Sequence, residues 1–168
     1  MAAPLWVNGW TILLHPLFLE QIAALVWETQ RARSRDPSGY KNRNAAKRLA
    51  GVLKLAFHAI PQDPTSRVYL QGGTLGTQHK HWLRAKFFQQ YRLFFRCDRG
   101  SRVIVYGWVN DEVTKRAYGS ATDAYKVFSA MLAKGNPPDD WTTLKAACDA
   151  VVSAGAHDLL GRANELLR

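Results

Sequence analysis

Residues 82–109, with the sequence WLRAKFFQQYRLFFRCDRGSRVIVYGWV, decide the fold. In the first part of this stretch, apolar and polar or basic side chains alternate. Because successive side chains of a strand point to opposite faces, Arg84 and Lys86 would share one face with Trp82, and three apolar residues would share the other. The alternation therefore predicts a half-buried strand over residues 82–87.

The remainder of the stretch continues the same pattern. Residues 91–96 place two arginines and a phenylalanine on one face, and residues 98–101, Asp-Arg-Gly-Ser, form a turn sequence. Residues 103–109 are apolar on both faces, which is typical of a central strand. We expect a small twisted antiparallel meander of three or four strands.

The residues before this stretch predict a helical hairpin. Pro16 stands at a suitable first helical position, and apolar residues then recur at helical spacing up to the turn at 36–39. A second helix is expected over residues 40–60, ended by Pro61. Its first half is basic, which gives it a core face and a cationic face; the basic residues are Lys41, Arg43, Lys47 and Arg48.

Residues 61–76 are rich in Pro, Gly, Ser and Thr and predict a loop, with a short strand near residues 68–70. A further helix is expected from about Ser120, where Ser120 and Asp123 have the spacing of a capping box, to Gly135.

Another short helix is expected over residues 141–152. The fold class is therefore α+β, with one domain over residues 1–153. Residues 154–168 form an Ala/Leu-rich tail that is helical or flexible, and no chemistry is expected there.

Positive charge is concentrated in the middle of the chain. The 168 residues carry a net charge of +10. Residues 31–116 hold 18 Lys and Arg against five Asp and Glu, whereas the segments on either side are slightly acidic. A basic surface of this kind favours a polyanionic partner such as nucleic acid over a role in solubility alone, since Arg, which binds phosphate with a planar fork, outnumbers Lys.

Several classes of protein are excluded. The most apolar stretch, residues 5–19, is interrupted by polar residues and Pro16, so no membrane span is expected. Two cysteines, Cys97 and Cys148, cannot form a disulfide framework, and we expect a soluble cytoplasmic protein.

Common enzyme sites are also missing from the sequence. The glycines at 72–76 lack the lysine of a phosphate-binding loop, and no nucleophile elbow is present. His79 and His81 lie in a basic context without a carboxylate nearby in sequence, so we expect neither a metal site nor a cofactor.

The basic face of the predicted hairpin is the remaining candidate site. Like charges on neighbouring strands cost stability, so Arg84, Lys86, Arg92 and Arg96 suggest a use. A hydrated surface or an acidic partner protein would also explain them. Aromatic residues nearby could stack on bases and favour RNA; these are Trp82, Phe94 and Tyr118.

Such a face could also cleave RNA without a histidine pair. Cleavage requires a deprotonated ribose 2′-OH, a stabilised pentavalent phosphate and a protonated leaving 5′-oxygen. Arginines stabilise the phosphate. A lysine crowded by other cations can act as the base, and a tyrosine hydroxyl can position the 2′-OH or relay a proton.

Longer strings of the sequence resemble the YhaV family of toxins. They are residues 80–87 (KHWLRAKF), 90–96 (QYRLFFR), 106–112 (YGWVNDE), 118–125 (YGSATDAY) and 135–141 (GNPPDDW), together with Asn8-Gly9-Trp10 and His15-Pro16. The resemblance covers about residues 5–145 in order, which leaves the C-terminal tail outside it.

The resemblance implies a RelE-like fold and a type II toxin that cleaves mRNA, in most relatives on the ribosome, without a metal. It also implies a PrlF-like antitoxin whose complex with the toxin binds operator DNA. Carried over to this sequence, the catalytic residues are Arg84, Lys86, Arg92, Arg116 and Tyr118. The RNA-binding residues that we assign beside them are Lys41, Arg43, Lys47, Arg48, Lys80, Trp82, Arg96 and Lys115.

Two alternatives to an mRNA endonuclease stay open at this point. A non-catalytic RNA- or ribosome-binding module would block translation by occupancy and leave transcripts intact. A protein-interaction domain would bind an acidic partner and have no affinity for RNA.

Overall fold

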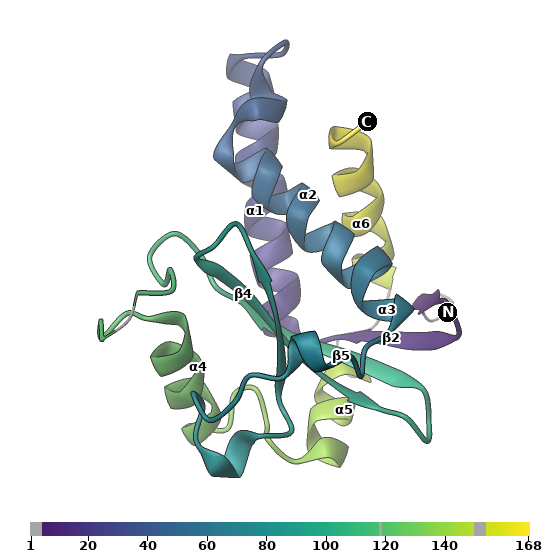
Figure 1. Cartoon of the computed structure of the whole chain (residues 1–168). Helices are drawn as coiled ribbons and strands as arrows, with labels where there is room; N and C mark the ends of the chain where they lie inside the picture. The colour runs from purple at the N-terminus through teal and green to yellow at the C-terminus, as the bar shows by residue number, and fades with distance from the viewer. Residues whose placement is uncertain (1–4, 118, 150–153) are drawn as a thin grey trace.

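A computed structural model describes residues 5–117, 119–149 and 154–168. Figure 1 shows a central sheet with helices on both sides. The strands are β1 (Leu5–Val7), β2 (Trp10–Leu14), β3 (Leu83–Phe87), β4 (Tyr91–Asp98) and β5 (Val103–Val109), and their order in the sheet is β1-β2-β5-β4-β3. The predicted α+β class is confirmed.

The antiparallel hairpins β3–β4 and β4–β5 are present as predicted. The prediction of a purely antiparallel sheet is wrong. The strands β1 and β2 add an N-terminal hairpin, and β2 pairs in parallel with β5, with Thr11 opposite Val103. The turn between β1 and β2 is Asn8-Gly9, both with positive φ, a pair that suits tight hairpins. The N-terminal segment therefore contributes to the sheet.

The first face of the sheet is covered by α1 (Pro16–Arg35), α2 (Asn44–Lys54) and α6 (Ala154–Leu166). His15 caps α1 by accepting a hydrogen bond at Nδ1 from the backbone N–H of Leu17, at 3.1 Å. Figure 1 shows α1 and α2 rising together from the sheet with α6 beside them. The C-terminal tail is thus a helix, and Leu159 and Leu160 are buried.

The predicted second helix is interrupted. A 3₁₀ turn (Tyr40–Asn42) precedes α2, and a π-helical turn (Leu55–Ala59) separates it from α3 (Ile60–Gln62). The strand expected near residues 68–70 is a 3₁₀ turn (Arg67–Tyr69), after which Leu70 makes one isolated bridge to Leu83.

The second face of the sheet is covered by α4 (Ala124–Ala133) and α5 (Trp141–Asp149). Helix α4 begins after Asp123, which is itself the N-cap and accepts a hydrogen bond from the N–H of Tyr125, so the predicted capping box is wrong. The expected end of the next helix, at residue 152, lies outside the described residues. Gly135 follows α4 with φ of +80°, as predicted.

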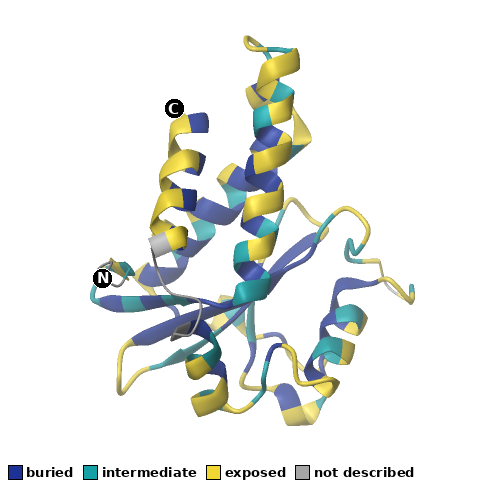
Figure 2. Ribbon diagram, turned by 180° about the vertical axis from the view of Figure 1, so that it is seen from behind, coloured by how far each residue is buried: buried dark blue, intermediate teal, exposed yellow. Residues whose placement is uncertain are grey.

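The core against α4 is aromatic. Phe94 stacks on Phe128 with ring centroids 4.3 Å apart, and the Trp82 ring packs edge-on against Phe128. Gly107 makes room for Trp82, since a Cβ atom there would lie 2.8 Å from Trp82 Cζ3. Figure 2 shows the buried residues following the sheet, while the outer sides of the helices are exposed.

Candidate active site

Arg84 on β3 and Arg92 on β4 meet at one hydroxyl group. The Nε group of Arg84 donates to the Tyr125 hydroxyl at 3.1 Å, and the Nε group of Arg92 donates to the same oxygen at 3.2 Å. A tyrosine hydroxyl has acceptor capacity for both bonds and one proton to donate. Tyr125 thus fixes two guanidinium groups side by side and still has a proton to give.

A third arginine joins this group from the loop after β5. The guanidinium carbon of Arg116 lies 4.7 Å from the centre of the Tyr125 ring, and that of Arg92 lies 5.9 Å from it. Electron-rich aromatic faces attract cations, so the ring supports both charges. We call Arg84, Arg92, Arg116 and Tyr125 the arginine cluster.

The carboxylate of Asp123 fixes the position of the Arg116 side chain. Its Oδ1 atom accepts hydrogen bonds from Arg116 Nη1 at 2.6 Å and from the N–H of Ala117 at 2.7 Å. Burial of this carboxylate works to raise its pKa, but the hydrogen bond from Arg116 and the backbone bonds outweigh burial, and the pKa of Asp123 is lowered from its ordinary value of 3.8. Asp123 is therefore ionised at neutral pH, and its negative charge pairs with Arg116.

Asn110 joins the loop after β5 to the start of β4. Its Oδ1 accepts from the N–H of Arg92 at 2.6 Å, and its Nδ2 donates to the carbonyl oxygens of Gln90 and Thr114. Arg116 adds a backbone bond to the Gln90 carbonyl at 2.8 Å. Since Asn110 is almost fully buried, these bonds hold the strand end and the loop in a fixed relation.

The structure brings together three of the five predicted catalytic residues, Arg84, Arg92 and Arg116. Lys86 is exposed and is the direct cross-strand partner of Arg92. Tyr118 lies outside the described residues. Sequence reasoning missed Tyr125 and Asn110.

Two predicted RNA-binding residues, Trp82 and Arg48, are buried, so their assignment to RNA binding is wrong. The Trp82 side chain is 0% exposed beneath α4, and Phe94 is equally buried, so neither ring can stack on a base. Arg48 is 5% exposed and lies over the Tyr91 ring, 4.0 Å from a carboxylate oxygen of Glu112. It therefore belongs to the packing between α2 and the sheet.

The other predicted RNA-binding residues are distributed over separate surfaces. Lys47 and Lys80 are exposed. Arg43 pairs with Asp36 at 3.4 Å, Lys115 pairs with Glu112 at 2.9 Å, and Lys41 donates to the carbonyl of Arg168. Arg96 is half-buried between the rings of Trp82 and Trp141 and donates to the carbonyl of Asp139.

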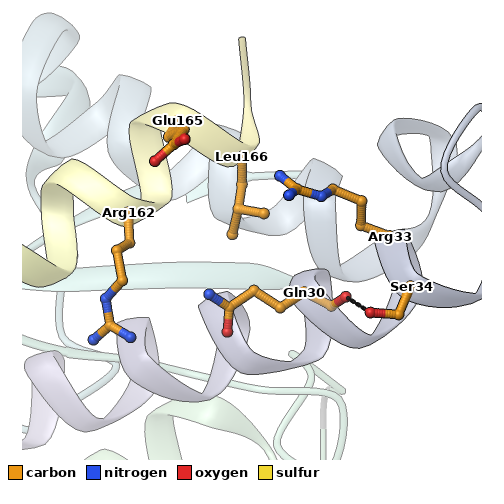
Figure 3. Close-up of a pocket in the computed structure, with 6 residues that line it drawn as sticks. All are labelled: Gln30, Arg33, Ser34, Arg162, Glu165 and Leu166. Carbon is orange, nitrogen blue, oxygen red and sulfur yellow. Dashed lines mark hydrogen bonds between the residues drawn. The ribbon is translucent and has the colours of Figure 1, made fainter.

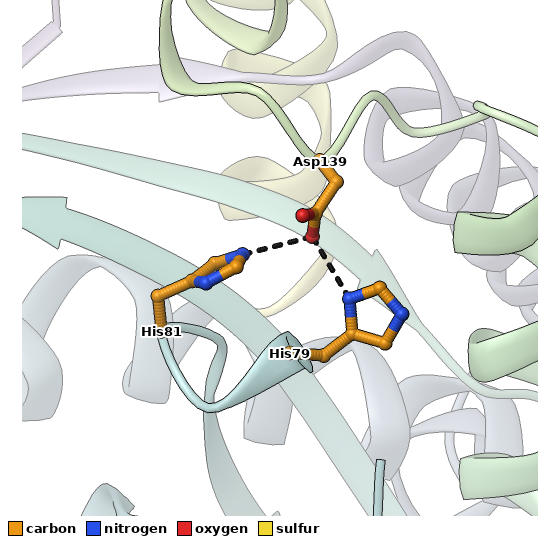
Figure 4. A group of neighbouring side chains, drawn as sticks. All are labelled: His79, His81 and Asp139. Atoms are coloured by element: carbon orange, nitrogen blue, oxygen red, sulfur yellow. Dashed lines mark hydrogen bonds and ion pairs between the residues drawn. The ribbon is translucent and has the colours of Figure 1, made fainter. Parts of the chain in front are cut away.

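A second polar group lies beside Arg96. Figure 4 shows His79, His81 and Asp139 pointing toward one another. Asp139 is 60 residues from His79 and 58 from His81 in the sequence, but its Oδ1 lies 3.1 and 2.8 Å from their ring nitrogens. A carboxylate therefore lies near the histidines in space, contrary to the sequence-based argument against a metal site. Burial works to raise the pKa of Asp139, but hydrogen bonds from His81 and Trp82 outweigh it and lower the pKa.

A pocket of about 250 Å³ lies between α1 and α6, away from both polar groups. Figure 3 shows Gln30, Arg33 and Ser34 on one side and Arg162, Glu165 and Leu166 on the other. Its chemistry is mixed, with two arginines and a glutamate, and it contains none of the arginine cluster. Within the described residues, no helix is long and apolar enough to cross a membrane.

Comparison with known proteins identifies close relatives. A family model described as "Toxin with endonuclease activity, of toxin-antitoxin system" matches residues 12–149. "Ribonuclease toxin YhaV" of Escherichia coli strain K12 is 46% identical over 146 residues, covering 86% of this chain and 95% of the relative.

"Toxin YhaV" of Escherichia coli O157:H7 matches with the same identity and coverage. "Toxin YhaV" of strain CFT073 is 45% identical over the same length. No solved structure matches this fold significantly.

Proposed function

Since the chain belongs to the YhaV family of toxins with endonuclease activity from toxin-antitoxin systems, we propose that it is an endoribonuclease that cleaves mRNA on the ribosome. The observation that carries this proposal is the convergence of Arg84, Arg92 and Arg116 on Tyr125. Three guanidinium groups held by one tyrosine, two at its hydroxyl and one over its ring, suit a phosphate that gains charge during reaction.

In the proposed reaction the ribose 2′-oxygen attacks the adjacent phosphorus, and the bond from phosphorus to the 5′-oxygen breaks. The products are a 2′,3′-cyclic phosphate and a free 5′-hydroxyl. Arg84 and Arg92 stabilise the pentavalent phosphate, with Arg116 as a third donor. We assign Lys86 as the base that takes the 2′-OH proton and Tyr118 as the relay that returns a proton to the leaving oxygen.

The Tyr125 hydroxyl acts in this proposal as a positioning group. It holds the two Nε groups 3.1 and 3.2 Å from one oxygen, so the guanidinium groups do not need to be ordered when substrate binds. Such preorganisation lowers the cost of reaching the transition state. All of these steps use side chains of this chain, and the proposed chemistry is metal-independent.

The wider proposal concerns partners and fold class. A RelE-like fold is supported by the helical hairpin on one face of the sheet beside antiparallel β3–β4–β5. We propose docking to ribosomal or messenger RNA in the cytoplasm through exposed cations such as Lys47 and Lys80. A PrlF-like antitoxin would neutralise the toxin, and operator DNA would be bound through that complex.

The test is cleavage of one defined mRNA by purified protein, with and without ribosomes. We expect cleavage with ribosomes, products ending in 2′,3′-cyclic phosphate, and loss of cleavage in Arg84→Ala and Arg92→Ala. Arg31→Ala on α1, which removes an exposed arginine that lies over Trp27, is the matched control and should cleave normally. Cleavage by both cluster variants at the normal rate would contradict the site assignment.

The same assay separates the alternatives. Arrested translation with intact transcripts would identify a protein that acts by occupancy. Absence of RNA binding across a salt titration would identify a protein-interaction domain, because binding through phosphate contacts weakens steeply with salt.

A further inference from the structure

Three side-chain nitrogen atoms converge on one oxygen atom at the far end of β4 from the arginine cluster. Asp139 Oδ1 lies 3.1 Å from His79 Nδ1, 2.8 Å from His81 Nε2 and 2.9 Å from Trp82 Nε1. A carboxylate oxygen has about two lone pairs. Three N–H groups therefore exceed what this oxygen accepts well, and the two imidazoles would each need their proton on the side facing Asp139.

A metal ion resolves this crowding. We propose that His79, His81 and Asp139 bind a divalent transition-metal ion, with Zn²⁺ as the best match. Each imidazole then gives a lone pair to the ion instead of a proton to Oδ1, and Oδ1 keeps one lone pair for the ion and one for Trp82.

The distances fit this assignment. In a tetrahedral site with zinc–ligand bonds of about 2.0–2.1 Å, neighbouring ligand atoms lie about 3.3 Å apart. The two nitrogen–oxygen distances of 3.1 and 2.8 Å are close to that value, and the three ligand atoms lie within 4.8 Å of one another. Two imidazoles and one carboxylate suit zinc and related ions, while magnesium and calcium prefer oxygen ligands.

Neighbouring residues form hydrogen bonds to these ligands and so fix their orientation, as is usual around metal sites. The indole of fully buried Trp82 donates to the carboxylate, Arg96 donates to the Asp139 carbonyl, and Gln71 donates to the His79 carbonyl at 3.1 Å. The positive charge of Arg96 lies beside Asp139, and the negative charge of the neighbouring Asp140 partly offsets it. His79 is buried whereas His81 is exposed, which leaves an entry path and a fourth position for water.

The role of the ion would be structural. His79 and His81 lie in the segment before β3, and Asp139 lies between α4 and α5. A bound ion would join these two segments over the aromatic core. The inference is independent of the proposed function, because it uses no residue of the arginine cluster.

The test is binding of Zn²⁺, and of Co²⁺ as a spectroscopic probe, to the full chain after removal of metals by a chelator. We expect one ion per chain by calorimetry, a raised Tm, and Co²⁺ absorption bands of a low-coordinate site with nitrogen ligands. His81→Gln, at an exposed position, should weaken binding at least tenfold while the folded circular-dichroism spectrum is kept. The control His58→Gln removes another exposed histidine and should leave binding unchanged.

Absence of stoichiometric binding by the wild-type chain would overturn the proposal, as would equal affinities of wild type and His81→Gln. Asp139→Asn adds a second variant that retains a side chain able to accept from Trp82, and it should also lose the ion. RNA cleavage measured in chelator tests the proposed function separately: cleavage that persists without metal supports the arginine chemistry whether or not zinc binds.

Discussion

The Nε group of Arg92 lies 3.2 Å from the hydroxyl oxygen of Tyr125, which joins the start of β4 to the first turn of α4. The two residues are 33 positions apart in the sequence, and the segment between them includes all of β5 and the loop after it. A helix that packs on the sheet thus supplies the group that orders the basic face of a hairpin.

Tyr125→Phe removes the shared acceptor while it keeps the ring beneath the arginines. We expect cleavage of mRNA to slow by about 10- to 100-fold, because misplacement of positioned groups costs rates of this size, with a smaller change in KM. The measurement is single-turnover cleavage at several substrate concentrations. Tyr40→Phe is the control: its hydroxyl donates to the Leu166 carbonyl at 2.6 Å, remote from the cluster, and its cleavage rate should be normal. Equal rates for both variants would remove Tyr125 from the site.

Asp123→Asn tests the support of Arg116 and of helix α4. Loss of the ion pair with Arg116 and of one of the two acceptor oxygens should cost about 1–3 kcal/mol at pH 7. Because the pKa of Asp123 is lowered in the folded state, the carboxylate stabilises the fold above about pH 3.8, its ordinary value, and this stability is lost as pH falls through the lowered folded value. Urea denaturation should therefore show wild type and variant converging below about pH 3.8, and a constant difference would contradict this role.

His15→Asn tests a buried cap. Burial lowers the pKa of His15 from 6.5 to about 4 in the folded protein. The unfolded chain therefore takes up a proton that the folded chain does not, and stability is full above pH 6.5 and declines as pH falls toward 4. Asparagine also caps helices well, so the variant should fold and show a smaller decline over this interval.

The control for His15 is His58→Asn, at an exposed histidine. It should keep the wild-type dependence of unfolding free energy on pH between 7.5 and 4. If His15→Asn has the same dependence as wild type, His15 is not a source of it.

Gly107→Ala tests the fit of Trp82 against β5. The added Cβ atom would lie 2.8 Å from the indole ring, so we expect destabilisation of about 1–3 kcal/mol from overpacking. Gly161→Ala on α6 is the matched substitution at an open position, where nothing lies within 4 Å of the new atom. It should stabilise the helix by up to about 1 kcal/mol, as measured by the midpoint of urea denaturation.

The central hairpins were predictable from local signals: apolar and basic side chains alternate along β3 and the start of β4, and β5 is a short continuous apolar run after a turn sequence. Pairing of β2 with β5 was not, since Thr11 and Val103 meet without any local sequence signal. The Asn8-Gly9 turn was a usable signal for the first hairpin. The strands β1 and β2 are short, and the apolar beginning of α1 follows them closely, so the sequence shows no clear alternation there.

At the candidate site, the sequence places Arg84 and Arg92 on one face but does not show what covers that face. Helix α4 covers part of it, which buries Trp82 under Phe128 and brings in Tyr125. Within an apolar helix pattern, Tyr125 has the appearance of an ordinary core residue. Asp139 likewise reaches His79 only through the packing of distant segments.

The parallel pairing of β2 with β5 joins segments that are synthesised at different times. Chains emerge from the ribosome N-terminus first, so β2 is made long before its partner, and Arg84 and Arg92 emerge before Tyr125. A growing chain therefore cannot hold both guanidinium groups against the tyrosine until α4 has left the exit tunnel. The arginine cluster can therefore form only when translation of the chain is nearly complete.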